Sequence, residues 1–290
     1  MDLLKSADQV VEDYISACDG KIKLSFSKLL VKAVLAGAMI AFGASAGNVA
    51  SHAVLNVGLS RLASAVVFPV GLMMIVLTGC ELFTGDCLMA MSWMTKKQSL
   101  ANIIRVLILV FAGNLIGASL VAFGASLSGQ FDYSSGLLGA YSIKVALGKV
   151  NLSFSQALIS GILCNILVCA AIILAGAAKD VTGKLIAIFF VIMLFVTEGF
   201  EHCVANMYYI TSGLIASHNP HYLQTALEHY GFTMEKLKTL NLKTYFINNL
   251  FPVTLGNIIG GALCLGFPLV YLNLSNQKKK LNNNSVMEVA

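Results

Sequence analysis

Charged residues are scarce in this chain. Asp, Glu, Lys and Arg together make up 11% of its 290 residues, whereas hydrophobic residues make up 57%. Soluble domains carry about 25% charged residues, so the composition excludes a soluble globular protein and predicts an integral membrane protein. No cleavable signal peptide is expected either, because residues 1–25 are too polar for one.

The sequence also lacks motifs that are typical of several classes of enzyme and of metal-binding protein. The seven cysteines lie mostly in apolar segments, and no pair has convincing zinc spacing. The sequence has no His-Glu-x-x-His pattern of a metalloprotease, and no nucleophile can be assigned to any histidine. We therefore expect no enzyme activity, no catalytic residue, no metal, no cofactor and no nucleic-acid partner.

Six apolar segments exceed the roughly 20 residues that a spanning helix needs. They lie at about 29–51, 62–94, 100–127, 154–177, 184–215 and 244–273. The second and fifth are too long for simple spans, and polar residues interrupt both. The sequence predicts an all-α membrane protein whose pore domain covers 29–273, with its second and fifth helices broken.

The flanking segments have a different character. Within residues 1–28, apolar positions recur at helical spacing with charged residues between them, which predicts an amphipathic cytoplasmic helix. A surface anchor and a gate over the cytoplasmic mouth both remain open for this helix. Residues 274–290 carry three lysines and then three asparagines, and we expect a disordered cytoplasmic tail.

Basic residues indicate the orientation in the membrane. If the N-terminus is cytoplasmic, 13 of the 19 Lys and Arg residues fall on the inner side and 6 on the outer side. Cytoplasmic loops are enriched in positive charge. We therefore predict a multi-pass protein with both termini inside.

An internal repeat relates the two halves. Residues Gly113–Leu120 match Gly256–Leu263, and Gly79-x-Glu81 resembles Gly199-x-Glu201. Since each repeat holds three spans, the second must insert with the opposite orientation. The sequence therefore predicts two inverted three-helix repeats with a site near mid-depth.

Polar residues at the two breaks are candidates for function, because such groups at membrane depth usually face a pathway. Thr84 can donate and accept hydrogen bonds, and Leu82 and Phe83 could narrow a pore. His202 could offer a small anion a hydrogen bond or a proton, and Glu201 could orient its imidazole. The glutamates Glu81 and Glu198 could instead satisfy backbone amides freed at the breaks.

Three further polar residues have two interpretations each. Asn165 and Asn257 could hydrogen-bond His202 or the permeant species, or could join helices. Lys149, on the predicted outer side, could attract anions to the mouth, or could be an ordinary solvated loop lysine.

At these residues the chain resembles the formate/nitrite transporter family. The matching motifs span Gly79–Gly85, Gly161–Ala170, Gly199–Met207 and Gly256–Gly261, and Cys80 replaces a smaller residue usual in the first motif. The resemblance implies an aquaporin-like six-helix protomer, a homopentamer with one pore per subunit, and a bacterial cytoplasmic (inner) membrane as the location.

The family pattern also assigns positions along the pore. It implies that Leu82 and Phe68 form the cytoplasmic constriction and that Phe195 contributes to the outer one, with Thr84 and His202 facing each other between them. Asn165, Asn257 and Lys149 match positions thought to assist the anion.

The resulting hypothesis is a channel or transporter for small monovalent weak-acid anions. Hydrosulfide is favoured because the chain is most similar to the hydrosulfide-channel branch, and formate and nitrite stay open. A first alternative is a proton-coupled formate or nitrite transporter. A second is a neutral-solute aquaporin-like channel, although the only Asn-Pro pair, Asn219-Pro220, falls in a predicted loop.

Overall fold

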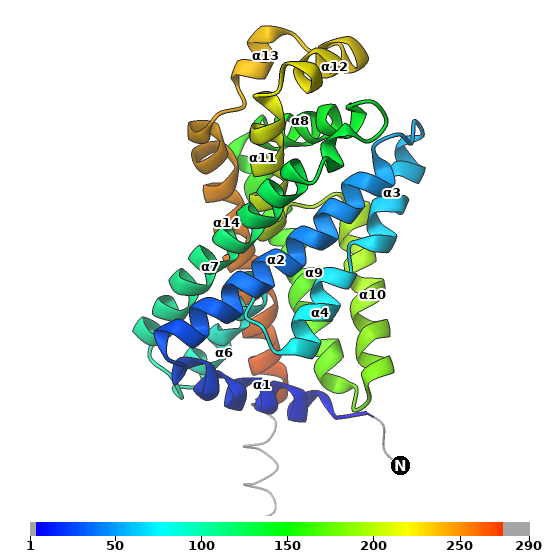
Figure 1. The fold of residues 1–290 in the computed structure, drawn as a ribbon. Coiled ribbons are helices and arrows are strands. Elements are labelled where there is room, and N and C mark those ends of the chain that lie inside the picture. The colour runs from blue at the N-terminus through cyan, green and yellow to red at the C-terminus, as the bar shows by residue number, and fades with distance from the viewer. Residues whose placement is uncertain (1–3, 275–290) are drawn as a thin grey trace, which may run out of the picture.

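The computed structural model describes residues 4–274, which fold into helices joined by short connections. Helix α1 lies across one end of the elongated molecule, and α12 and α13 lie at the other (Figure 1). Six stretches of the described residues are long and apolar enough to span a membrane: Phe26–Ser51, Val57–Thr78, Leu100–Leu127, Phe154–Ala177, Val181–Glu198 and Thr244–Leu274. The six predicted spans are confirmed.

The first half of the chain forms α1 (Ala7–Ile22), α2 (Phe26–Ser51), α3 (Val57–Val67), α4 (Val70–Thr78), α5 (Phe83–Asp86), the 3-10 turn η1 (Cys87–Met89), α6 (Ala90–Met94) and α7 (Leu100–Leu127). The second half forms η2 (Gln130–Asp132), α8 (Leu137–Val150), α9 (Phe154–Ala177), α10 (Val181–Glu198), α11 (Cys203–Ser217), α12 (Pro220–Tyr230), α13 (Met234–Lys238), the π-helical η3 (Thr244–Leu250), α14 (Phe251–Ile258) and the π-helical η4 (Ile259–Gly266).

Helix α1 is amphipathic, as its sequence pattern predicts. Ser6 and Gln9 form a capping box at its start, and its buried face consists of Val10, Val11, Ile15 and Cys18. The helix packs against α6, α7 and α9, and the Tyr14 hydroxyl donates a 2.8 Å hydrogen bond to the Gly85 carbonyl. The tail expected at 274–290 lies outside the described residues from 275 onward.

The second and fifth spans are broken at equivalent glycines. Helix α4 ends at Gly79 (φ 65°) and α10 ends at Gly199 (φ 74°), a left-handed conformation that glycine adopts without steric cost. The chain resumes helical structure at α5 and α11. Helix α4 ends at the α1 end of the molecule, where Lys21 pairs with Glu81. Helix α10 begins at that same end, beside the bridge of Leu4 to Ala178, so the two broken helices run in opposite directions.

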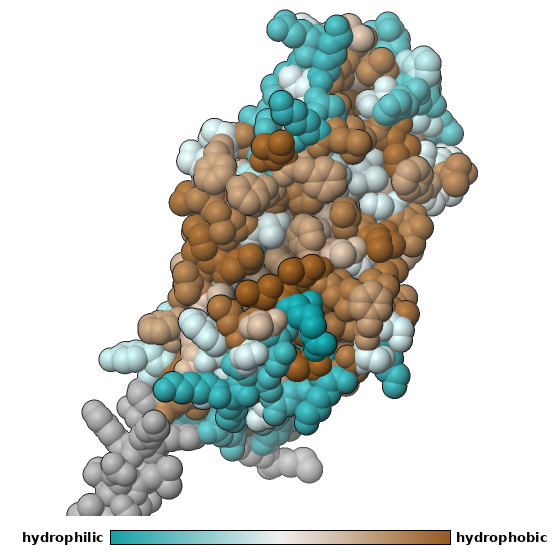
Figure 2. All heavy atoms as spheres, turned by 90° about the vertical axis from the view of Figure 1, so that its left-hand side faces the viewer, coloured by the Kyte–Doolittle hydropathy of each residue, from teal (hydrophilic) through white to brown (hydrophobic). Residues whose placement is uncertain are grey.

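Small residues let pairs of helices approach closely. Helix α2 crosses α7 at Gly37, Gly113 and Gly117, and α9 crosses α14 at Gly161 and Gly256. A Cβ atom at any of these glycines would overlap backbone or side-chain atoms of the facing helix. Figure 2 shows the outer surface around α7 and α14 as an apolar band between two polar ends, as expected of a membrane protein.

Gly117→Ala is expected to destabilise the fold. Its Cβ would overlap the Val34 carbonyl oxygen of α2, so the helices must move apart, and such overpacking costs about 1–3 kcal/mol. Gly124→Ala on the same helix is the matched control, because within residues 4–274 no atom outside its own stretch of helix lies within 4 Å of the added Cβ. Thermal unfolding in detergent should show a Tm several degrees lower for Gly117→Ala alone; equal melting of both variants would contradict the close crossing.

Candidate functional site

Two separate cavities approach the breaks from opposite ends of the molecule. The larger, the α12-side cavity, has a volume of about 410 Å³, and its lining includes Phe68, Phe195 and His202. The smaller, the α1-side cavity, has a volume of about 160 Å³, and its lining includes Leu72 and Leu82. The residues of the two breaks therefore lie between two openings.

His202 and Thr84 are brought together from the two breaks. The His202 Nε2 atom lies 2.9 Å from the Thr84 hydroxyl oxygen, and both residues are buried. His202 is also the N-cap of α11, since its Nδ1 accepts a 3.0 Å hydrogen bond from the Ala205 backbone N–H. A backbone amide can only donate, so Nδ1 is unprotonated and the neutral ring carries its proton on Nε2. His202 therefore donates to Thr84, and the Thr84 hydroxyl hydrogen remains available to a third group.

Two buried asparagines, which we name the asparagine bridges, satisfy the broken backbone. Asn257 accepts from the Cys203 N–H and donates to the carbonyls of Gly161 and Glu201. Asn114 accepts from the Phe83 N–H and donates to the carbonyls of Ala33 and Glu81 in the same manner. Backbone groups inside a membrane need such partners. Both asparagine side chains therefore have a structural role.

The third amide, Asn165, links the first break to Asn257, the asparagine bridge of the second break. Its Nδ2 donates to the carbonyls of Thr84 and Asn257, at 3.0 and 2.6 Å. Neither Asn165 nor Asn257 bonds His202, because their amides bind backbone groups. Of the two interpretations that the sequence left open, these contacts support the joining of helices.

A buried ion pair lies beside the second break. Lys149 Nζ lies 2.9 Å from a Glu201 carboxylate oxygen, and Asn206 and Asn249 donate to the other oxygen at 2.6 and 3.1 Å. The expectation that Glu201 orients His202 is therefore wrong, since both its oxygens are engaged elsewhere. The Lys149 side chain lines the α12-side cavity but is only 14% exposed, so it is no freely solvated loop lysine.

An equivalent cluster lies beside the first break. Lys21 of α1 pairs with Glu81 at 2.7 Å and with Asp86, and Lys32 donates to the Gly79 carbonyl at 2.7 Å. Burial lowers the pKa of Lys21, but the nearby Asp86, Tyr14 and Glu81 raise it well above its ordinary value. Glu81 thus pairs with cations instead of freed amides, and Glu198 is exposed at the end of α10.

The aromatic residues differ from the expected arrangement. Phe68 packs edge-on against Phe195, with ring centroids 5.6 Å apart, and Phe195 stacks on His202. The expected pairing of Phe68 with Leu82 is wrong, because α3 packs against α10 and places Phe68 on the α12 side. On the α1 side Leu82 shares the cavity lining with Leu72, a residue that the sequence analysis did not single out.

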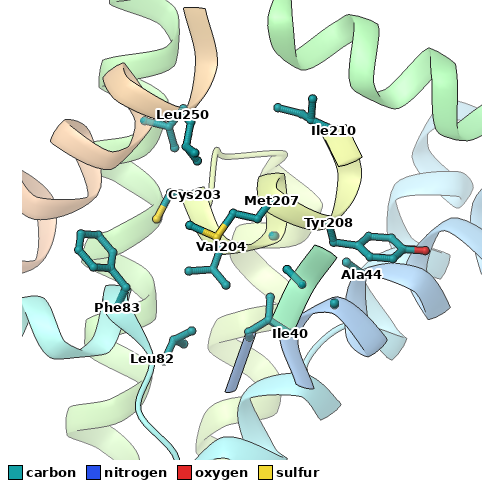
Figure 3. Packing of buried hydrophobic residues seen from close by; sticks show 14 of the residues in the cluster. Ile40, Ala44, Leu82, Phe83, Cys203, Val204, Met207, Tyr208, Ile210 and Leu250 are labelled. Atoms are coloured by element: carbon teal, nitrogen blue, oxygen red, sulfur yellow. The ribbon is translucent and has the colours of Figure 1, made fainter. Parts of the chain in front are cut away.

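Phe83 lies away from both cavities. Its ring packs against Phe111 at 5.1 Å, and it belongs to neither cavity lining. Leu82 has extended backbone (φ −112°, ψ 123°), so neighbouring side chains point to different sides, as Figure 3 shows for Leu82 and Phe83. The expected contribution of Phe83 to a constriction is therefore wrong.

Breaking the Lys149–Glu201 pair should destabilise the protein. Lys149→Met leaves a buried carboxylate without its cation, which we expect to cost up to about 3 kcal/mol. The double variant Lys149→Met/Glu201→Gln removes both charges, and its glutamine can still accept from Asn206 and Asn249, so most of the loss should be recovered. Thermal unfolding of both single variants and the double variant measures this coupling; additive losses would contradict a direct pair.

Comparisons with known proteins agree with this geometry. The family model described as Formate/nitrite transporter matches residues 8–271. The chain is 38% identical over 217 residues to the formate channel FocA of Haemophilus influenzae, covering 74% of this chain and 75% of that protein. It is 37% identical over 273 residues to a probable formate transporter of Methanothermobacter thermautotrophicus, covering 87% and 92%.

A solved structure agrees as well. A pentameric formate channel with formate bound superposes with a TM-score of 0.75 at 30% identity, covering 85% of this chain and 98% of that chain. From the family model, which matches nearly the whole chain, together with these relatives, we conclude that this protein belongs to the formate/nitrite transporter family.

Proposed function

We propose that this protein conducts small monovalent weak-acid anions across a bacterial plasma membrane. The observation that carries the proposal is the Thr84–His202 hydrogen bond, a buried polar pair between the apolar residues of the two cavities. The names of the relatives favour formate, and the resemblance to the hydrosulfide-channel branch favours hydrosulfide. Nitrite has the same charge and a similar size, so all three are candidate substrates.

The apolar residues would act as a barrier to hydrated ions. An ion that passes Phe68 and Phe195, and then Leu72 and Leu82, loses hydration that hydrocarbon walls do not replace. Between these residues the Thr84 hydroxyl can donate to the anion while it accepts from His202. This donor would offset part of the lost hydration in the middle of the path.

The hydrogen bonds of His202 favour donation of a hydrogen bond over donation of a proton. An imidazolium needs a proton on Nδ1, and that atom accepts the Ala205 N–H that caps α11. Charging the ring would break this cap, and leaving the ring neutral preserves it. We therefore propose that His202 acts by fixing the Thr84 hydroxyl in the orientation that presents its hydrogen to the anion.

The assembly and orientation are proposals as well. The similar solved structure is pentameric, and this chain exposes apolar side chains along its membrane faces, including Ile108, Leu120 and Phe251. We propose a homopentamer in contact with lipid, with one pore in each subunit. The excess of Lys and Arg at the α1 end favours that end as the cytoplasmic one.

Flux in proteoliposomes tests the proposed function. Uptake of formate, hydrosulfide, nitrite and glycerol should be compared for the wild type, His202→Asn and Thr84→Val. Asparagine can still cap α11 but loses the contact to Thr84, so we expect His202→Asn and Thr84→Val each to slow anion uptake about tenfold or more, as the loss of a buried hydrogen bond worth about 1.4 kcal/mol predicts.

His218→Asn is the matched control, because His218 is exposed at the other end of α11. It should transport like the wild type. Full anion flux in His202→Asn would refute the role of the central pair. Glycerol uptake without anion flux would place the protein among neutral-solute channels, and anion uptake driven by a proton gradient would favour the proton-coupled alternative.

A further inference from the structure

The α12-side cavity contains three cationic side chains in unequal electrostatic states. Lys149 is neutralised by Glu201 at 2.9 Å. Arg61 donates to the Thr197 carbonyl at the C-terminal end of α10, at 3.3 Å. Lys144 is exposed and forms no ion pair or hydrogen bond within residues 4–274. The positive charge that a solute meets in this cavity is therefore carried by Arg61 and Lys144, and Lys149, paired with Glu201, contributes little net field. Of the two uncompensated cations, Lys144 is the one whose charged group makes no hydrogen bond within residues 4–274.

Two aromatic rings hold the Lys144 ammonium in place. Its Nζ lies 4.7 Å from the ring centroid of Tyr230 on α12 and 5.5 Å from that of Tyr141, one turn earlier on α8. The Tyr141 hydroxyl lies 3.0 Å from the Ser51 hydroxyl of α2, which fixes that ring. A cation over aromatic faces is attracted without being neutralised, so the charge is both positioned and available to an anion.

Two buried hydrogen-bond donors in the same cavity have no partner. The Tyr230 hydroxyl and the Asn48 Nδ2 are buried atoms without a hydrogen bond in the described residues, and both residues line the α12-side cavity. Leaving such a group unpaired costs about 1–3 kcal/mol, so these donors indicate a bound water or ligand. Burial and then the nearby Tyr141 raise the pKa of Tyr230 to about 12, which keeps its hydroxyl a donor at neutral pH.

We propose that Lys144 forms the first binding site for a small monovalent anion in the α12-side cavity, with Tyr230 and Asn48 as hydrogen-bond donors. The anion would bind here in partly hydrated form, before it reaches the Phe68–Phe195 pair. This site rests on the proposed function and adds a second location to it, distinct from the central pair. Its effect is to raise the local anion concentration at the mouth and leave the passage of the central barrier unchanged.

Removing the charge of Lys144 tests whether this residue attracts the anion or has only a structural role. Initial rates of formate uptake should be measured against formate concentration in proteoliposomes, at low and at high ionic strength. Lys144→Met should raise the KM roughly three- to tenfold at low ionic strength with a nearly unchanged maximal rate. The effect should shrink at high ionic strength, because surface fields are screened within about 10 Å at 0.1 M salt. Lys144→Arg, which keeps the charge, should retain the wild-type KM.

Two further variants complete the test. Lys243→Met removes an exposed lysine of the same end that does not line the cavity, and should leave the KM unchanged. Tyr230→Phe keeps the ring over Lys144 but loses the hydroxyl, and should raise the KM about two- to threefold. Equal KM values for Lys144→Met and Lys243→Met at low ionic strength would overturn the site, as would a fall in the maximal rate alone.

An independent binding readout distinguishes this site from the proposed function. A bound anion stabilises the folded state, so formate should raise the Tm of the wild type in detergent, and Lys144→Met should reduce that rise to the part that binding at the central pair contributes. If the wild type shows the rise but conducts no anion, the proposed function fails and the site stands. If anions are conducted normally but neither the KM nor the Tm depends on Lys144, the site fails and the proposed function stands; absence of both flux and stabilisation removes both.

Discussion

A helix broken inside a membrane must satisfy its freed backbone groups within the protein. Asn114 and Asn257 meet this constraint at the two breaks with the same three hydrogen bonds each. Asn165 then ties the first break to the second bridge. Once these amides are in place, Thr84 and His202 have fixed positions opposite each other.

The buried carboxylates at the two breaks are also paired in the same way. Each break has a glutamate, Glu81 or Glu201, that is almost fully buried and held by a lysine from an element outside the break. Carboxylates at this depth would repel an anion if they were left alone, and these pairs remove their net charge. The two sides differ at the position five residues after the glutamate, where Asp86 on the α1 side has its counterpart in Asn206. The α12 side therefore needs fewer cations for neutrality, and within residues 4–274 Arg61 and Lys144 have no carboxylate partner there.

The sequence predicted the architecture well because hydropathy and glycine patterns are local. The six spans and the two breaks follow from apolar length and from Gly79 and Gly199. Of the two asparagine bridges, the sequence analysis named Asn257 and missed Asn114. The internal repeat aligned Asn114 with Asn257, and that alignment alone could have identified Asn114. Side-chain partners were missed where they depend on packing across elements. Nothing in the sequence places Phe68 beside Phe195 instead of Leu82, or Lys21 beside Asp86, because α3 and α1 reach these positions only in the folded chain.

His202 acts as a neutral donor whose Nδ1 accepts the Ala205 N–H. Nitrogen NMR of histidine-labelled protein in bilayers tests it directly, with the His202 signals assigned by their loss in His202→Asn. We predict an unprotonated Nδ1 and a protonated Nε2 at neutral pH. A ring protonated on Nδ1, whether as the other tautomer or as an imidazolium, would contradict this assignment of the proton.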